Sequence, residues 1–162
     1  LDRSNTRAAG PVPGTIVLTG EQRSRGAELT LTGRLLPQWQ IAAGYGYTEA
    51  EVRAGDNAGR QVAQVPRHTL SLWNRYDVTP QFGVGAGLIH QSGSFATIGN
   101  TVRLPAWTRI DAALYYDVSD RLSLQLNVEN LANADYFPLA HNDNNITPGA
   151  PRNARVTVNY RF

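Results

Sequence analysis

The chain has 162 residues, of which 41% are hydrophobic, and its formal net charge at pH 7 is only +2. These values permit one globular domain, and no apolar run approaches the roughly 18 residues that a transmembrane helix needs. The 15 Lys and Arg residues are scattered rather than gathered on one basic face, so nucleic acid is not an expected partner. The absence of Cys excludes disulfides, zinc–thiolate sites and thiol catalysis.

The first residues, Leu1-Asp2-Arg3-Ser4-Asn5, are polar and are predicted to form a loop. The sequence contains no Met, and no charged segment followed by an apolar one opens it as in a signal peptide. A mature protein after cleavage is one explanation. A fragment that lacks its upstream part is the other, and the predicted number of strands favours it.

Seven segments alternate apolar and polar residues, which is the pattern of β-strands with one apolar and one polar face. The clearest is Leu122–Glu129, where every even position is apolar and every odd position is polar. Most are about 10 residues long, enough for a tilted strand to cross a bilayer. In chain order, the predicted strands cover residues 28–32, 39–48, 69–78, 82–91, 109–118, 122–129 and 155–162.

The predicted connections also alternate, between short and long. Short turns are expected at Leu36–Gln38, Thr79–Gln81 and Ser119–Arg121. Long loops rich in Gly, Asn, Asp and Pro are expected at Val52–Val65, Gly93–Leu104 and Asp135–Pro151. Short turns on the periplasmic side and long loops on the extracellular side are typical of an outer-membrane barrel.

A soluble antiparallel sandwich would alternate as well, but its strands are usually only about 5–6 residues long. Aromatic residues gather near the strand ends, as in interfacial girdles: Trp39, Phe82, Tyr115, Tyr116, Tyr160 and Phe162. The polar faces carry bulky charges that suit a hydrated lumen: Arg34, Arg75, Arg109, Asp111 and Arg161. We therefore predict an all-β fold, an antiparallel transmembrane β-barrel.

Seven strands do not close a bacterial barrel, which has an even number of strands starting at eight. Further strands are therefore expected upstream. Five glycines lie in the inward register, and they either give space to a plug inside the barrel or ease the coiling of the strands: Gly44, Gly46, Gly83, Gly85 and Gly87.

Several segments together resemble the closing strands of TonB-dependent siderophore receptors. This resemblance is carried by Asn127–Leu131 with Tyr136, His141–Arg152 and the terminal Tyr160-Arg161-Phe162, and upstream Gly20–Leu29 resembles a strand common in the same family. The similarity runs from about Gly14 to Phe162. Such receptors are plugged barrels of 22 strands, so the resemblance implies that residues 1–162 are the C-terminal part of the barrel domain. The plug domain and the earlier strands would be absent from this chain.

The resemblance implies TonB-dependent uptake of a ferric siderophore at the bacterial outer membrane, with no covalently bound cofactor. The implied partners are the ferric siderophore, outer-membrane lipid, the barrel assembly machinery and the inner-membrane TonB complex, which the missing N-terminal part would contact. A passive porin or an outer-membrane barrel enzyme such as a lipase is the alternative. The sequence has no catalytic Ser motif, and its three His residues lack metal-ligand spacing, so no catalytic or metal site is expected.

Candidate ligand-binding residues must face the lumen near the extracellular strand ends or lie on the long loops. Aromatic rings can stack on a siderophore, and Arg attracts an anionic chelate. His68 and His90 are expected at the lipid interface, and His141 either touches the ligand or belongs to a hydrogen-bonding loop. The candidates are Gln91, Phe95, Trp107, Arg109, Tyr136 and His141, and Tyr160 and Phe162 are expected to form the assembly signal.

Overall fold

The computed structural model describes residues 1–9 and 14–162, which form strands, turns and loops. Within this part of the chain, no helix has the length and apolar character needed to cross a membrane. The strands are, in chain order, β1 (Asp2–Ala9), β2 (Ile16–Leu36), β3 (Trp39–Ala54), β4 (His68–Asp77), β5 (Phe82–Gln91), β6 (Ser94–Phe95), β7 (Arg103–Leu104), β8 (Trp107–Ser119), β9 (Leu122–Glu129), β10 (Leu139–Asn142), β11 (Asn145–Thr147) and β12 (Asn153–Tyr160).

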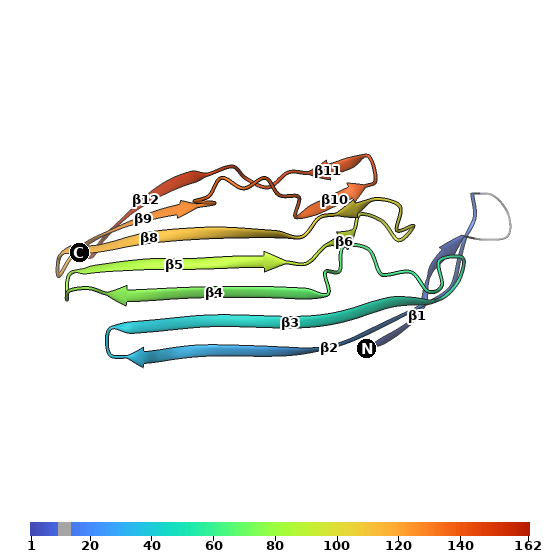
Figure 1. Ribbon diagram of the computed structural model, residues 1–162, viewed down its shortest axis with the longest axis horizontal. Coiled ribbons are helices and arrows are strands. Elements are labelled where there is room, and N and C mark those ends of the chain that lie inside the picture. The colour runs from blue at the N-terminus through green and yellow to red at the C-terminus, as the bar shows by residue number, and fades with distance from the viewer. Residues whose placement is uncertain (10–13) are drawn as a thin grey trace.

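One large antiparallel sheet contains eight of the described strands, in the order β1-β2-β3-β4-β5-β8-β9-β12. Figure 1 shows these strands side by side, with short turns and the C-terminus at one end. The small hairpins β6–β7 and β10–β11 lie at the opposite end, where the predicted long loops are. Strands β1 and β12 form the two edges of this sheet, so the sheet is open and does not close on itself.

The polar opening segment is a strand, and the prediction of a loop there was wrong. Strand β1 pairs with the start of β2, which extends over 21 residues. Leu1 and Ser24 exchange two backbone hydrogen bonds of 2.7 and 2.8 Å, and Arg23 forms an ion pair with Asp2. The described part of the sheet therefore has one strand more than the seven predicted, because β1 is held by backbone pairing without an alternating apolar face.

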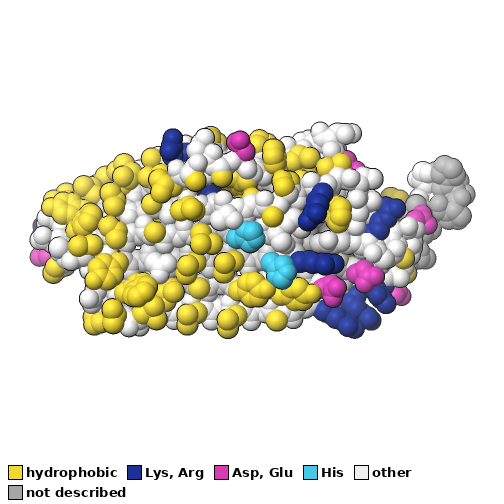
Figure 2. All heavy atoms as spheres, in the orientation of Figure 1, with side chains coloured by type: hydrophobic (Ala, Val, Ile, Leu, Met, Phe, Trp, Pro, Cys, Tyr) yellow, Lys and Arg dark blue, Asp and Glu magenta, His cyan; other side chains and the backbone are white. Residues whose placement is uncertain are grey.

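The pairing register places the predicted apolar residues on one face of the sheet. One row crosses five neighbouring strands: Leu31, Ala43, Leu72, Leu88 and Ile110. These residues face outward, and large apolar side chains of this face such as Leu29 and Val156 are two-thirds exposed. Figure 2 shows apolar side chains covering this face from the turn end past its middle, with charged side chains gathered toward the loop end. The predicted alternation is confirmed.

Aromatic residues border the outer face at the turn end, where Trp39 pairs with Tyr76 and Phe82 pairs with Tyr116. Tyr115 does not belong to this girdle, contrary to the prediction, because its pairing with Gly83 places it on the inner face. There the guanidinium of Arg75 lies 4.2 Å from the centre of its ring.

The two interfacial histidines also lie where they were predicted. His68 pairs with Tyr47, and His90 pairs with Leu70, both in the outward register. Each imidazole is hydrogen-bonded to a hydroxyl group at 2.8 Å, that of Tyr45 for His68 and that of Thr108 for His90. Their polar atoms therefore have partners at the edge of the apolar belt.

The inward glycines make room for neighbouring side chains of the wall itself. A Cβ on Gly85 would lie 2.7 Å from the indole of Trp73, and one on Gly87 would overlap the same indole. A Cβ on Gly83 would lie 2.9 Å from the Asp77 carboxylate. The wall thus fills the space above these three glycines by itself. The sequence suggested space for a plug or easier coiling of the strands. The structure gives a third explanation, which depends on side chains of the neighbouring strands.

Candidate functional site

Three of the candidate residues lie together at the loop end of the inner face, where β5 and β8 pair. Gln91 is the direct neighbour of Trp107, and Ile89 is the direct neighbour of Arg109. Because side chains alternate along a strand, Trp107, Arg109 and Asp111 all project from the inner face of β8. Three of the predicted residues, Gln91, Trp107 and Arg109, thus share one patch.

Arg109 is held by Asp111, two residues further along the same face. Its Nη2 and Nε atoms both donate to Oδ2 of Asp111, at 2.8 and 3.2 Å. The other carboxylate oxygen, Oδ1, accepts the backbone N–H of Asn130 at 2.8 Å. The side chains of Arg109 and Asp111 are 21% and 14% exposed. The two charges therefore compensate each other in a half-buried setting, and the Arg109 side chain is fixed in direction.

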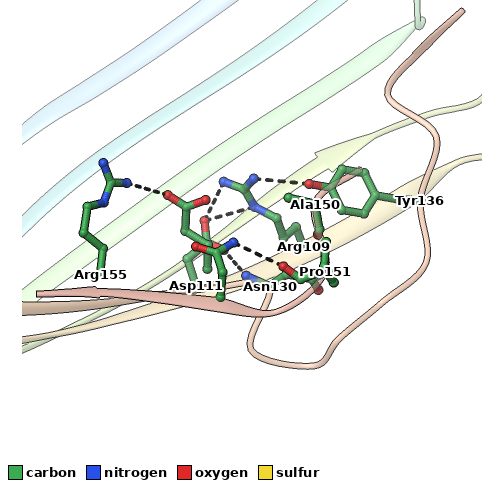
Figure 3. A network of polar contacts seen from close by, with 9 residues as sticks. Arg109, Asp111, Asn130, Tyr136, Ala150, Pro151 and Arg155 are labelled. Carbon is green, nitrogen blue, oxygen red and sulfur yellow. Dashed lines mark hydrogen bonds and ion pairs between the residues drawn. The ribbon is translucent and has the colours of Figure 1, made fainter. Parts of the chain in front are cut away.

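Asn130 organises the start of the last long loop, directly after β9 ends. Its φ of 52° lies in the left-handed region, which Asn tolerates better than most residues. The side chain is fully buried: Nδ2 donates to the carbonyls of Ala134 and Ala150, and Oδ1 accepts the N–H of Ala134. Figure 3 shows how these contacts connect β8, the end of β9 and the loop before β12.

In the sequence, Asn130 belongs to one of the segments that carry the family resemblance, but no role was predicted for it. The available signal was a polar residue that follows directly after the regular alternation of Leu122–Glu129. That signal marks the end of a strand, but it does not reveal the partners that the loop supplies.

Tyr136 comes to the same place from the last long loop, but it is buried and only 6% exposed. Its ring centre lies 4.7 Å from that of Trp107, and its hydroxyl accepts a hydrogen bond of 3.4 Å from Arg109. Gly149 lies against the ring and leaves no space for a Cβ there, and its N–H donates to the Tyr136 carbonyl. The ring face of Tyr136 is therefore covered, and the ring contacts Trp107 and Arg109 from the side of the loop.

The remaining candidates lie further out, on loops that pack together. We call residues 55–67, 92–106 and 131–152 the loop cap. Phe95 lies on β6 opposite Arg103, and His141 lies exposed on β10. The cap has a small core of buried Ala96, Leu104 and Ala140. Within the described part of the chain, no group of three or more His, Cys, Asp or Glu residues is placed to hold a metal ion.

The two residues predicted to form the assembly signal lie at the opposite end of the sheet. Tyr160 ends β12 and pairs with Leu122, while Phe162 lies beyond the strand and is fully exposed. Their rings meet edge to face, with centres 5.3 Å apart. Because Leu122 directly follows the Ser119–Arg121 turn, both rings lie at the end with the short turns.

A comparison with protein families decides the affiliation. Residues 2–131 match the family described as TonB dependent receptor-like, beta-barrel. The chain belongs to this family. Its sheet is accordingly a C-terminal segment of an outer-membrane barrel, as predicted.

Two receptors illustrate the similarity. The chain is 32% identical to the probable TonB-dependent siderophore receptor PiuA of Acinetobacter baumannii, over 99% of this chain and 23% of that protein. The crystal structure of PiuA superposes with a TM-score of 0.91, covering 98% of this chain and 24% of the PiuA chain. The catecholate siderophore receptor Fiu of Escherichia coli K12 is 31% identical, over 92% of this chain and 21% of that protein.

The closed form of Fiu superposes with a TM-score of 0.82 at 29% identity, over 99% of this chain and 24% of that one. The chain thus spans less than a quarter of the length of these relatives. Both relatives are siderophore receptors by name.

Proposed function

We propose that the receptor containing this chain takes up a ferric siderophore by TonB-dependent transport. Residues 1–162 would form the C-terminal part of its barrel domain, and a plug domain with earlier strands would complete it. The observation that carries the proposal is the aromatic and arginine patch on the inner face, at the loop end of a wall whose outer face is apolar. A relative of similar sequence is a catecholate siderophore receptor.

The patch offers two kinds of contact to an iron chelate. The half-exposed ring of Trp107 can stack on a flat catecholate, in the way that aromatic rings pack together. Arg109 has five N–H donors, of which two are used by Asp111 and one by Tyr136. Two donors therefore remain for the oxygen atoms of an anionic ligand. Gln91, next to Trp107, adds an amide that can donate or accept.

The candidate residues then fall into two groups, those that contact the ligand and one that holds the contacting residues in place. Gln91, Trp107 and Arg109 are proposed to contact the ligand from the wall, and Phe95 and His141 from the loop cap. Tyr136 is proposed to act by holding Trp107 and Arg109, because its own ring is covered. The proposed partners beyond the siderophore are the TonB complex, outer-membrane lipid and the assembly machinery. No covalently bound cofactor is part of the proposal.

The experiment is a titration of the purified full-length receptor with a ferric tris-catecholate chelate, in detergent. Trp107→Ala removes the stacking surface and should weaken binding about tenfold, which corresponds to about 1.4 kcal/mol. Trp39→Ala is the matched control, because Trp39 lies on the outer face at the turn end and should leave the dissociation constant unchanged.

Equal dissociation constants for the wild type and Trp107→Ala would remove Trp107 from the site. A receptor that binds no ferric chelate and conducts small solutes passively would instead support the porin alternative.

A further inference from the structure

The three segments of the loop cap are connected to one another pairwise, although each belongs to a different hairpin of the barrel. Residues 55–67 bind residues 92–106 through Arg60, which donates to the Gly99 carbonyl at 2.6 Å, and through Asn100. The Asn100 side chain both donates to the carbonyl and accepts the N–H of Gln61, each at 2.9 Å. A side-chain amide thus pairs with a backbone as a neighbouring strand would.

Residues 92–106 bind residues 131–152 through Asp143. Its carboxylate accepts hydrogen bonds from the hydroxyl groups of Thr97 and Thr101. The buried residues Ala96, Leu104 and Ala140 pack in the same contact, with Val102 and Ile146 against them. The second and third segments therefore share both polar contacts and an apolar core.

Gln64 belongs to residues 55–67 and contacts both of the other segments of the loop cap, residues 92–106 and 131–152. Its backbone N–H donates to the Phe95 carbonyl at 2.8 Å. Its side chain binds the backbone of Ala140 twice: Nε2 donates to the carbonyl at 2.7 Å, and Oε1 accepts the N–H at 3.2 Å. The φ of Gln64 is 56°, an unusual value for this residue type. A left-handed backbone conformation costs free energy in a residue other than Gly, so it indicates that the surrounding contacts hold Gln64 in place.

We propose that Gln64 is the positioning residue of the loop cap, and that it fixes the β6–β7 and β10–β11 hairpins relative to each other. The segment that contains Gln64 supplies none of the candidate ligand contacts. It nevertheless binds Phe95 directly and Ala140, the neighbour of His141, so the two cap candidates are presented on one preassembled surface. The cap is then a fixed rim whose three segments open together rather than three independent loops.

The test is amide hydrogen exchange, resolved to single residues, on the full-length receptor without ligand. Its outcome therefore does not depend on the proposed function. Gln64→Asn keeps an amide and suits the positive φ, but it is one methylene too short to reach Ala140. We expect the Ala140 amide to exchange about tenfold faster, because it loses its acceptor in a buried contact.

Gln61→Asn is the matched control, since it makes the same chemical change three residues away. In the part of the chain that the structure describes, the Gln61 side chain donates to the Val65 carbonyl of its own segment, at 2.6 Å. Exchange at Ala140 should therefore stay at the wild-type rate. The proposal is overturned by unchanged exchange at Ala140 in Gln64→Asn, or by an equal increase in the two variants.

Discussion

At the residue scale, the loops around the candidate site depend on a few side-chain amides. These amides form the hydrogen bonds that a neighbouring strand would otherwise offer to the loop backbone. Asn130, Asn100 and Gln64 each satisfy backbone groups of a loop, and all three have a positive φ. Trp107, Arg109 and Tyr136 were predicted from the sequence as separate candidate ligand contacts, and the structure brings them into contact with one another. It could not predict that Tyr136 is covered, because the cover comes from Trp107 and Gly149, which are far apart in the sequence.

Gly149 offers a direct test of this covered tyrosine. Gly149→Ala places a methyl group into the Tyr136 ring, so the ring or the loop must move. We expect a loss of about 1–3 kcal/mol in unfolding free energy, as is usual when a packed site is overfilled. The measurement is urea unfolding of the full-length receptor in lipid. In the control Gly33→Ala, the added methyl group meets open space, and the unfolding free energy should change little. Equal effects of the two changes would contradict the packing described here.

At the element scale, alternation predicted β3, β4, β5, β8, β9 and β12 because each has one face in contact with lipid. The alternation is missing in β1 and in the half of β2 around Gly20–Ala27, so it predicted neither. These strands extend past the apolar belt, where polar residues lie on both faces and no alternation remains. Strand β12 also ends at Tyr160, two residues before the predicted end, although the Arg161 N–H still donates to the Arg121 carbonyl.

The register of β9 makes a prediction about its two faces. Leu124 pairs with Tyr116 and Val158 on the outer face, whereas Gln125 pairs with Tyr115 and Thr157 on the inner face. Leu124→Arg should cost more than Gln125→Arg but less than the roughly 2–4 kcal/mol of a midplane position, because Leu124 pairs with Tyr116 of the aromatic girdle at the turn end. Unfolding titrations of the full-length receptor in lipid vesicles measure both, and equal penalties would show that the register is wrong.

The end of β12 makes a prediction about assembly. Phe162 is fully exposed and contacts Tyr160 edge to face, so its deletion removes little burial, well below the about 1.5–3 kcal/mol of a fully buried Phe. We expect the deletion to lower the amount of receptor at the cell surface far more than it lowers the melting temperature of receptor refolded in detergent. Normal surface levels would contradict a role in assembly, and a large drop in melting temperature would make Phe162 a packing residue.

At the scale of the whole molecule, the apolar surface lies on the outside and the sheet has two open edges. Apolar side chains such as Leu29, Val156 and Val158 are more than 60% exposed, which in water would favour aggregation. The unpaired edges of β1 and β12 would expose backbone groups that lipid cannot satisfy. The exposed apolar face therefore needs lipid to cover it, and the two open edges need further strands to pair with them.

Expression of residues 1–162 alone, followed by sedimentation in buffer without detergent, tests this claim most directly. A barrel segment should aggregate, because neither its outer face nor its two edges are covered. The full-length receptor, purified in detergent, should remain dispersed under the same centrifugation. A soluble monomer of the 162-residue chain that unfolds cooperatively would contradict the account, since its apolar face would then have to be buried within the chain, as in a sandwich.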